Sequence, residues 1–486
     1  YVDVYRTATG PLSGAGALAV EESIRQMMRI YGAMRMRPPG QPEPGHGGPR
    51  FMSRLTEEPR PVLEVLAERL TEVVAARKAE AAGKAAEKAD DATAAPAPKR
   101  AEHPSTGWRP PVEGTPYHAL VRWIDAEAAS GPGGAPVRIT SDVLDAVGAP
   151  EHDLAWPLDC TVRPFGSGHE AVLDMTMPGG ILDARFNEAL EGLHGTLDHV
   201  EAYRAFLAEL DERTGVTSVE LMIPPLRDVA ANAVRRPAYA TAWTGDADLS
   251  GYCEPDPRRP MRFLPLTELT VRRHGDKVVV EHLGQRVRIL YHSMRVAPWP
   301  WSLLSSMLTY DNEQQDSNVP RLRCPLVALP DRDFLPRLLI GDAVVLSPAQ
   351  WRVKSGRFWD PAADGELDKA RRLVRLRAEL GLPRFVAVYS RGHYGKPYPC
   401  DLDSLAAVET VERALGPAGA AADPDLDVYV EEMLPAPDEM PTRDLAHLAD
   451  DRVAAEVMLR LPMHATPGDL AARAAGSRSA ELVAVP

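Results

Sequence analysis

The sequence predicts an α+β fold in which mixed helices and antiparallel sheets form two or three subdomains. The first observation is length, because 486 residues exceed what one hydrophobic core serves at roughly 100–200 residues per domain. The second is patterning: apolar residues recur at helical spacing over residues 181–210, whereas short apolar runs separated by turns follow residue 263. The third is the presence of 46 prolines, which favours loops and short elements.

The first predicted segment, residues 1–76, contains a strand at Tyr1–Val4 and a helix that begins near Ser13. Composition then changes abruptly to Ala, Lys, Glu and Pro, with almost no large apolar residue between Val74 and Trp108. Because such a stretch cannot bury much apolar surface, residues 77–110 are predicted to be a linker or a frayed helix.

An α/β subdomain is predicted for residues 111–262. It contains a strand at Val137–Ile139, a short helix capped by Ser141, helices at 181–190 and 199–210, and a strand at Val219–Ile223. The aromatic residues of these helices, including Tyr203 and Phe206, are expected to face the core.

Residues 263–486 are predicted to form a β-meander and a basic subdomain. Strands at 269–272, 278–282 and 287–290 are separated by turns at His274–Asp276 and Gly284. A strand at 343–346, a helix at 367–380 ended by Gly381, and a strand at 385–389 follow.

Charge and composition exclude several classes of protein. The formal charge of −14 argues against a protein that coats nucleic acid nonspecifically. The four cysteines are far apart, which favours buried thiols over disulfides or a zinc knuckle. The longest uncharged stretch of note, Val296–Tyr310, is shorter than the ~20 residues of a membrane span, so a cytoplasmic location is expected.

Common catalytic motifs are also missing from the sequence. It has no GxxxxGK[ST] loop, GxGxxG fingerprint, HExxH pair or GxSxG elbow. The histidines are scattered; His194 and His199 are five residues apart, which does not place them on one helical face, and they are interpreted as structural or surface residues.

A basic block interrupts this acidic chain between Arg321 and Cys400, where 15 Lys and Arg face 8 Asp and Glu. A cluster of this kind is typical of a phosphate-binding surface. The alternative is a solvated face with ordinary ion pairs. The candidate RNA-binding residues are Arg352, Lys354, Arg357, Arg371, Arg372, Arg375, Arg384, Arg391 and Lys396.

A second candidate site is the motif Asn232–Pro237, in which Arg235 and Arg236 precede a proline. The residue before proline avoids the α region, so this guanidinium pair sits in extended or loop backbone and could hold a carboxylate or phosphate. A surface loop is the alternative. Asp3 and Arg6 could be either a structural ion pair or a site carboxylate with its positioning residue.

Eight segments in order along the chain resemble the class I lantibiotic (lanthipeptide) dehydratases. They are Tyr1–Arg6 with Gly10–Ser13, Pro61–Leu66, Asn232–Pro237, Phe263–Leu269, Phe334–Arg352, Pro383–Val386, Asp401–Ser404 and Glu432–Pro435. The resemblance implies a glutamylation domain, which takes glutamate from glutamyl-tRNA and esterifies Ser or Thr side chains of a ribosomally made precursor peptide.

The resemblance also assigns roles to individual residues. Arg236, then Arg235, are the expected catalytic residues, with Asp3 as a carboxylate that aids transfer. Asn232 and Arg6 are expected to bind substrate. The basic block is expected to contact the tRNA acceptor stem. No metal or other cofactor is expected, since glutamyl-tRNA is a co-substrate.

The extent of the resemblance suggests the later half of a glutamylation domain. This would be a fragment of a split dehydratase, as in thiopeptide pathways where elimination is a separate protein. Expected partners are glutamyl-tRNA, the precursor peptide and a separate elimination-domain protein, with an N-terminal-half subunit or a second copy of the chain as further alternatives. Two other functions stay open: a peptide aminoacyl-tRNA ligase that extends a peptide C-terminus, and a noncatalytic subunit that binds tRNA or peptide.

Overall fold

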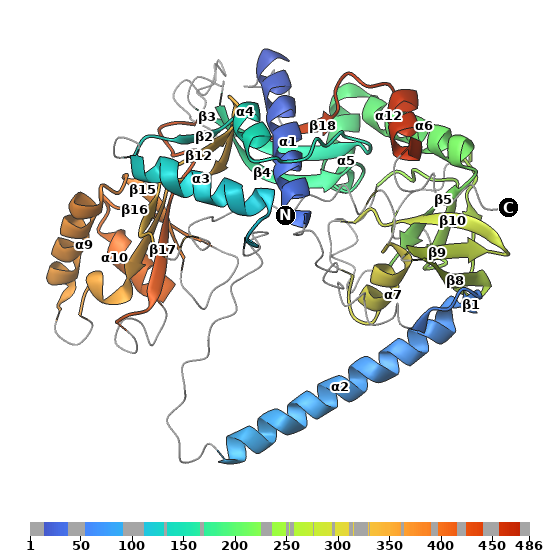
Figure 1. The fold of residues 1–486 in the computed structure, drawn as a ribbon, viewed down its shortest axis with the longest axis horizontal. Coiled ribbons are helices and arrows are strands. Elements are labelled where there is room, and N and C mark those ends of the chain that lie inside the picture. Colours follow the sequence, from blue (N-terminus) through green and yellow to red (C-terminus); the bar gives the residue numbers. More distant parts are fainter. Residues whose placement is uncertain are drawn as a thin grey trace.

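The described part of the chain consists of helices packed on three β-sheets. The computed structural model describes residues 14–36, 54–90, 111–130, 134–165, 170–224, 236–248, 252, 257–275, 277–293, 297–310, 314, 329, 331–360, 364–389, 397–415, 424–440 and 456–476. Figure 1 shows a five-stranded sheet at one end, a seven-stranded sheet at the other, and a six-stranded sheet between them.

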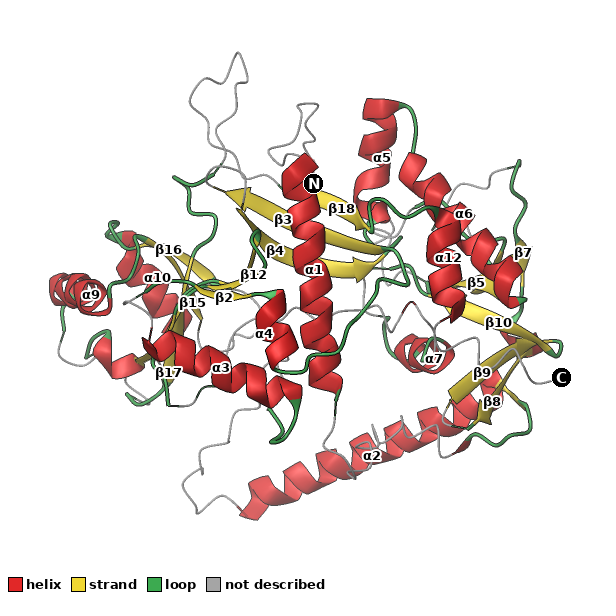
Figure 2. Ribbon diagram, turned by 45° about the horizontal axis from the view of Figure 1, so that its top comes forward, coloured by secondary structure: helices red, strands yellow, loops and turns green. Residues whose placement is uncertain are grey.

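The six-stranded sheet has the order β18-β3-β4-β13-β12-β2. Helix α1 (Gly14–Arg35) crosses it, with α3 (Pro116–Ser130) and α4 (Ser141–Ala146) beside it (Figure 2). Apolar side chains of α1 at helical spacing, including Ile24 and Met27, are fully buried in the core of this sheet. The strands are β2 (Val137–Ile139), β3 (Leu158–Phe165), β4 (Glu170–Pro178), β12 (Leu338–Ile340), β13 (Val344–Ser347) and β18 (Val457–Leu461).

The seven-stranded sheet has the order β1-β8-β9-β10-β5-β6-β7. The antiparallel meander of β8, β9 and β10 confirms the sequence prediction, whereas β10, β5, β6 and β7 pair in parallel. Helix α7 (Trp301–Leu308) packs against this sheet. The strands are β1 (Arg60–Pro61), β5 (Thr217–Met222), β6 (Ala242–Gly245), β7 (Arg262–Phe263), β8 (Leu269–His274), β9 (Lys277–His282) and β10 (Gln285–Leu290).

The five-stranded sheet, β11-β14-β17-β15-β16, is antiparallel throughout. Helices α9 (Glu366–Leu380) and α10 (Ala406–Leu415) pack on it, and Gly381 ends α9 in the left-handed conformation (φ 64°), as predicted. The strands are β11 (Phe334–Leu335), β14 (Gln350–Lys354), β15 (Phe385–Tyr389), β16 (Tyr398–Asp401) and β17 (Asp427–Glu432).

A fourth apolar core lies where the six-stranded and seven-stranded sheets approach each other. It is formed by α6 (Asp198–Thr214) and α12 (Pro467–Gly476) around Trp156, Tyr203 and Phe206, all three nearly inaccessible to solvent. The burial of Tyr203 and Phe206 confirms the predicted core face. Helix α5 (Asp183–His194) precedes α6, and its side chain at Phe186 is half-buried.

The α+β class is confirmed, but two of the three sheets are mixed rather than antiparallel. The predicted boundary at residue 262 falls inside both mixed sheets, which combine strands from either side of it. Helix α2 (Val62–Asp90) continues through the first part of the predicted linker and extends away from the seven-stranded sheet (Figure 1). The cap of α4 is Thr140 rather than Ser141, because the Thr140 hydroxyl accepts the backbone N–H of Val143.

Other sequence predictions concern single residues. Cys160 and Cys400 are buried free thiols, while Cys253 and Cys324 lie outside the described residues. The predicted strand at Tyr1–Val4 also lies outside them. Among the described helices, none has both the length and the apolar character needed to cross a bilayer.

Candidate functional site

Eight polar residues meet where the six-stranded and seven-stranded sheets adjoin, and two of them belong to α5 and α6. We call them the buried polar cluster. Seven are at most 7% exposed, and the side chain of the eighth, Arg460, is 16% exposed. Because burying polar or charged groups is costly unless they are paired, the contacts among them fix the local structure. The cluster consists of Asp159, Asp183, Tyr203, Glu220, Arg236, Tyr239, His292 and Arg460.

Arg236, the first choice from the sequence, has its guanidinium engaged by protein groups. Nη2 lies 2.5 Å from Oε2 of Glu220, and Nε donates to the carbonyl oxygen of His292 at 2.9 Å. Nη1 donates to the carbonyl oxygen of Pro237 at 3.1 Å. Only 3% of the Arg236 side chain is exposed. Its hydrogen bonds therefore fix the backbone at Pro237 and His292. Its predicted catalytic role stays a prediction.

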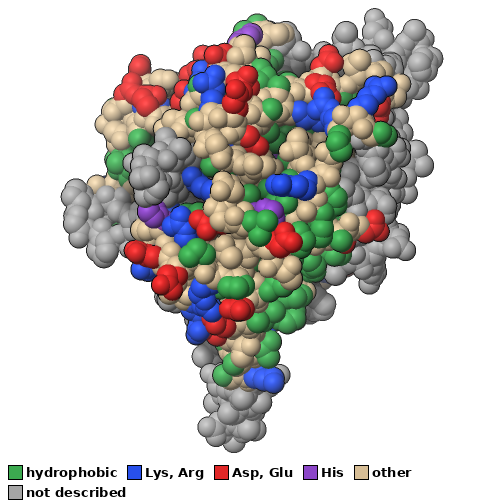
Figure 3. All heavy atoms as spheres, turned by 90° about the vertical axis from the view of Figure 1, so that its right-hand side faces the viewer, with side chains coloured by type: hydrophobic (Ala, Val, Ile, Leu, Met, Phe, Trp, Pro, Cys, Tyr) green, Lys and Arg blue, Asp and Glu red, His purple; other side chains and the backbone are tan. Residues whose placement is uncertain are grey.

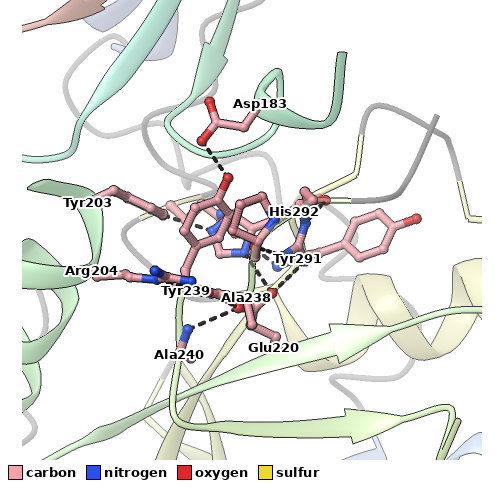
Figure 4. Close-up of polar contacts among 12 residues, drawn as sticks. Asp183, Tyr203, Arg204, Glu220, Ala238, Tyr239, Ala240, Tyr291 and His292 are labelled. Atoms are coloured by element: carbon pink, nitrogen blue, oxygen red, sulfur yellow. Dashed lines mark hydrogen bonds and ion pairs between the residues drawn. The ribbon is translucent and has the colours of Figure 1, made fainter. Parts of the chain in front are cut away.

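Glu220, in the middle of β5, holds the segment that leads into β6. Its Oε1 accepts the backbone N–H groups of Tyr239 (2.5 Å) and Ala240 (2.9 Å), as Figure 4 shows. Burial disfavours the charged form, but Arg236, His292 and the backbone of Ala240 outweigh it and hold the pKa of Glu220 well below its usual range. Glu220 is therefore a buried carboxylate.

His292, just after β10, is enclosed by aromatic rings. Its Nε2 lies 2.8 Å from the hydroxyl of Tyr203, and the rings of Tyr203 and Tyr239 meet it edge-on. Burial lowers the pKa of His292 although Glu220 opposes this, so the imidazole is neutral near pH 7. Gly180 lies against the same rings with φ 88°; a Cβ there would come within 2.9 Å of Tyr203 and 3.0 Å of His292.

Arg460, on β18, joins two carboxylates of other elements. Its Nε and Nη2 contact Asp159 on β3 at 2.6 and 2.9 Å, and Nη2 also contacts Asp183 at 2.5 Å. The Tyr239 hydroxyl donates to the second oxygen of Asp183 (Figure 4), which connects this ion network to the Arg236 segment. Burial raises the pKa of Asp159 to about 6, against the attraction of Arg460.

The cluster's hydrogen bonds thus fix residues 236–240 between two sheets. Arg204 of α6 adds a further contact by donating from Nε to the carbonyl oxygen of Ala238 at 2.8 Å. The arrangement is suited to hold the backbone next to residues 236–240 in one position. Its charges are satisfied within the protein, so it resembles the support of a site more than an open binding surface.

Six of the residues predicted from the sequence lie outside the described part of the chain. They are Asp3, Arg6, Asn232, Arg235, Arg391 and Lys396. The roles predicted for them stay predictions.

The described members of the basic block lie on or beside the five-stranded sheet, and most of them form ion pairs. Five have acidic partners, whereas Arg352 donates to the carbonyl oxygen of Leu329 (3.2 Å) and Arg375 to that of Arg371 (3.4 Å). The five pairs are Lys354–Asp427 (2.7 Å), Arg357–Glu379 (3.0 Å), Arg371–Asp368 (3.4 Å), Arg372–Asp364 (2.7 Å) and Arg384–Asp401 (2.9 Å).

The structure does not bring the basic block and Arg236 together. The described part of the basic block lies on or beside the five-stranded sheet, at the opposite end of Figure 1 from the seven-stranded sheet, whose residue Glu220 pairs with Arg236. Figure 3 shows the face on the side of the seven-stranded sheet, where basic and acidic side chains are interspersed. Within the described ranges, no group of three or more His, Cys, Asp or Glu residues could hold a metal ion.

The comparisons with known proteins define the family. The family model described as "Lantibiotic dehydratase, N terminus" matches residues 168–411, about half of the chain, so the chain belongs to the lantibiotic dehydratase family. The match includes Arg236, Glu220 and His292, but not Asp159 or Arg460. No curated protein matches the chain.

Solved structures share the fold at low sequence identity. The tRNA-dependent lantibiotic dehydratase MibB from Microbispora sp. 107891 is 18% identical with a TM-score of 0.54, over 85% of this chain and 37% of MibB. The glutamylation domain TbtB from thiomuracin biosynthesis is 19% identical with a TM-score of 0.52, over 92% of this chain and 50% of TbtB. A second TbtB structure, bound to 5'-phosphodesmethylglutamycin, is 18% identical with a TM-score of 0.52, over the same shares of the two chains. The chain thus spans half or less of these proteins.

Proposed function

We propose that this chain catalyses tRNA-dependent glutamylation of Ser and Thr side chains in a ribosomally synthesised precursor peptide. The observation that carries the proposal is family membership together with the fold of a glutamylation domain over 92% of the chain. Glutamylation is the first half-reaction of dehydration, and we propose that a separate protein performs the elimination.

The chemistry agrees with residues that this chain offers. An aminoacyl ester is already activated, so the enzyme needs mainly to position the acceptor hydroxyl and to stabilise developing charge. Neither task requires a metal or other cofactor, and glutamyl-tRNA serves as co-substrate. Because the reaction consumes aminoacyl-tRNA, the proposed location is the cytoplasm.

The proposed residues keep the roles inferred from the sequence. Arg236, Arg235 and Asp3 are proposed for transfer, and Asn232 and Arg6 for substrate binding. The buried contacts of Arg236 favour a positioning role, in which it fixes the backbone that follows Arg235. The basic block on the five-stranded sheet is the proposed tRNA contact.

The test is mass spectrometry of precursor peptides incubated with the chain, glutamate, tRNA and glutamyl-tRNA synthetase. We expect the peptide mass to increase by one glutamyl group per modified Ser or Thr, only when tRNA is present. Hydroxylamine should remove the added groups, because they are esters. Addition of an elimination protein should convert them to dehydrated residues.

Other outcomes would contradict this proposal. A hydroxylamine-stable addition at the peptide C-terminus would identify a peptide aminoacyl-tRNA ligase instead. Peptide or tRNA binding without any mass increase, in the presence and absence of the elimination protein, would identify a noncatalytic binding subunit.

A further inference from the structure

His199 lies at the half-buried edge of the buried polar cluster, as the second residue of α6. Its Nε2 is 2.7 Å from Oδ1 of Asn187 on α5. An amide oxygen only accepts hydrogen bonds, so in this orientation Nε2 carries the hydrogen and Nδ1 keeps its lone pair. Among the described residues, Nδ1 has no hydrogen-bond partner. The ring therefore keeps one nitrogen that can accept a proton.

The side chain of Asn187 is buried, unlike the half-buried ring of His199 that it contacts. Asn187 is 4% exposed, and its Nδ2 is buried without a hydrogen-bond partner within the described ranges. A buried donor without a partner costs more free energy than one neutral hydrogen bond returns. A buried polar group without a partner calls for an explanation, and a role at a functional site is one such explanation.

His199 is also connected directly to the cluster that fixes the Arg236 segment. Nη1 of Arg460 donates to the carbonyl oxygen of His199 at 3.1 Å, while the rest of that guanidinium binds Asp159 and Asp183. Asp183 in turn accepts the hydroxyl of Tyr239, whose ring lies against Arg236. The backbone at His199 and the backbone after Arg235 are therefore held by one network.

Burial, more than the charged groups around it, favours the neutral form of His199. Burial lowers the pKa of His199, and Arg460 lowers it further, whereas Asp183 and Asp198 oppose the shift. Near neutral pH the imidazole is therefore unprotonated and able to accept a proton.

We propose that His199 is the general base of glutamyl transfer, with Asn187 fixing its tautomer. The inference rests on the proposed function. Nδ1 removes the proton of the Ser or Thr hydroxyl as its oxygen attacks the glutamyl carbonyl carbon of glutamyl-tRNA. The ester bond to the ribose oxygen then breaks, and that oxygen takes the proton from the imidazolium. The new peptide ester, the free tRNA hydroxyl and the neutral imidazole balance the step.

The experiment compares single-turnover glutamylation rates over a range of pH for the full chain and three variants. Each assay uses glutamyl-tRNA and a peptide that the wild-type chain glutamylates. His199→Gln keeps a polar side chain but cannot take the proton, and His199→Ala allows rescue by added imidazole. His464→Gln is the control, because His464 is an exposed histidine that follows β18.

We expect the wild-type rate to fall at acidic pH as the histidine is protonated. His199→Gln should lower the rate by about 10²- to 10⁴-fold and abolish this acidic limb. The affinity for glutamyl-tRNA should change little, imidazole should restore part of the rate of His199→Ala, and His464→Gln should behave as wild type.

The outcomes separate this inference from the proposed function. A wild-type chain that does not glutamylate any peptide overturns both. An active wild type overturns the general-base role alone if His199→Gln keeps its rate, or if the slowed variants keep the acidic limb and are not rescued by imidazole. If His199→Gln folds poorly, the pH–rate profile of the wild type and the imidazole rescue of His199→Ala still test whether His199 is the general base.

Discussion

Arg236 and Glu220 form an ion pair of 2.5 Å in which the two side chains are 3% and 0% exposed. A pair this deeply buried stabilises the fold only while both partners are present, because removal of one leaves an uncompensated charge. The pair also joins β5 to the segment before β6, since Glu220 accepts backbone N–H groups of that segment. Substitutions at Arg236 therefore affect folding as well as any role in transfer.

Arg236→Ala should lower the free energy of unfolding by about 3–5 kcal/mol, because Glu220 is left buried and unpaired. From the sequence alone, the expectation is loss of glutamyl transfer with folding intact. The burial revises that expectation. Denaturant unfolding of the variant, beside the exposed control Arg384→Ala, measures the effect.

Paired substitutions separate stability from transfer. Arg236→Met with Glu220→Leu should be less destabilising than the sum of the two single variants, because neither charge stays buried alone. If the double variant folds well but does not transfer glutamate, the pair matters beyond stability. Additive losses would mean that the two residues do not depend on each other.

Asp159 should make stability fall as pH rises. Its pKa in the folded protein, about 6, exceeds the ordinary value of 3.8, so the folded state binds this proton more tightly. The contribution of Asp159 to the free energy of unfolding is therefore largest below about pH 4. It declines by at most about 3 kcal/mol as the pH rises to the folded pKa. Asp159→Asn, which cannot titrate, should remove this decline.

Unfolding midpoints measured from pH 4 to pH 8 test the Asp159 prediction. The control Asp342→Asn changes a carboxylate whose side chain is 93% exposed, and it should keep the wild-type slope. An unchanged slope in Asp159→Asn would show that another group titrates in this range.

The elements with regular apolar spacing were predictable from the sequence, and their boundaries lie within a few residues. The meander strands and α9 are examples, since alternation and a final Gly381 are local signals. Strands β3 and β4 escaped prediction because Asp159, Arg163 and Pro164 interrupt the apolar pattern of β3. Asp159 and Arg163 are tolerated there because they form ion pairs with Arg460 of β18 and with Asp174 of the neighbouring β4.

The candidate site was predictable only at Arg236, which stands in a short motif. Its partners lie between residues 159 and 460, and no local spacing connects them. A signal was nevertheless present. Glu220 stands between Val219 and Leu221, and Arg460 stands between two leucines; a charged residue inside an apolar strand needs a buried partner. The sequence reveals that need but not which residue meets it.

Gly180→Ala should disturb the cluster more than a comparable glycine change elsewhere. At φ 88°, the new Cβ would crowd Tyr203, His292 and Tyr239 at 2.9 to 3.2 Å. Gly195→Ala is the matched control, because its φ of 70° imposes a similar backbone strain of about 1–2 kcal/mol with no atom within 4 Å. We expect a larger loss of stability and of glutamyl transfer from Gly180→Ala. Equal effects of the two substitutions would mean that the rings of Tyr203, His292 and Tyr239 move aside for the new Cβ at little cost.

The basic block gives a prediction that depends on its ion pairs. Arg375 is exposed and forms no ion pair with any described residue, whereas Arg384 is held by both oxygens of Asp401. A guanidinium without an acidic partner is available to a phosphate, so Arg375→Ala should weaken tRNA binding. It should reduce the slope of log affinity against log salt by about 0.7–0.9, the value of one phosphate contact.

Arg384→Ala provides the comparison for the tRNA measurement. Because its charge is already balanced by Asp401, its loss should change the salt slope less than the loss of Arg375. Filter binding of labelled tRNA at several salt concentrations measures both slopes. If neither slope changes, the five-stranded sheet does not contact tRNA, and its ion pairs simply cover a solvated face. If Arg384→Ala has the larger effect, Asp401 must release the arginine when RNA binds.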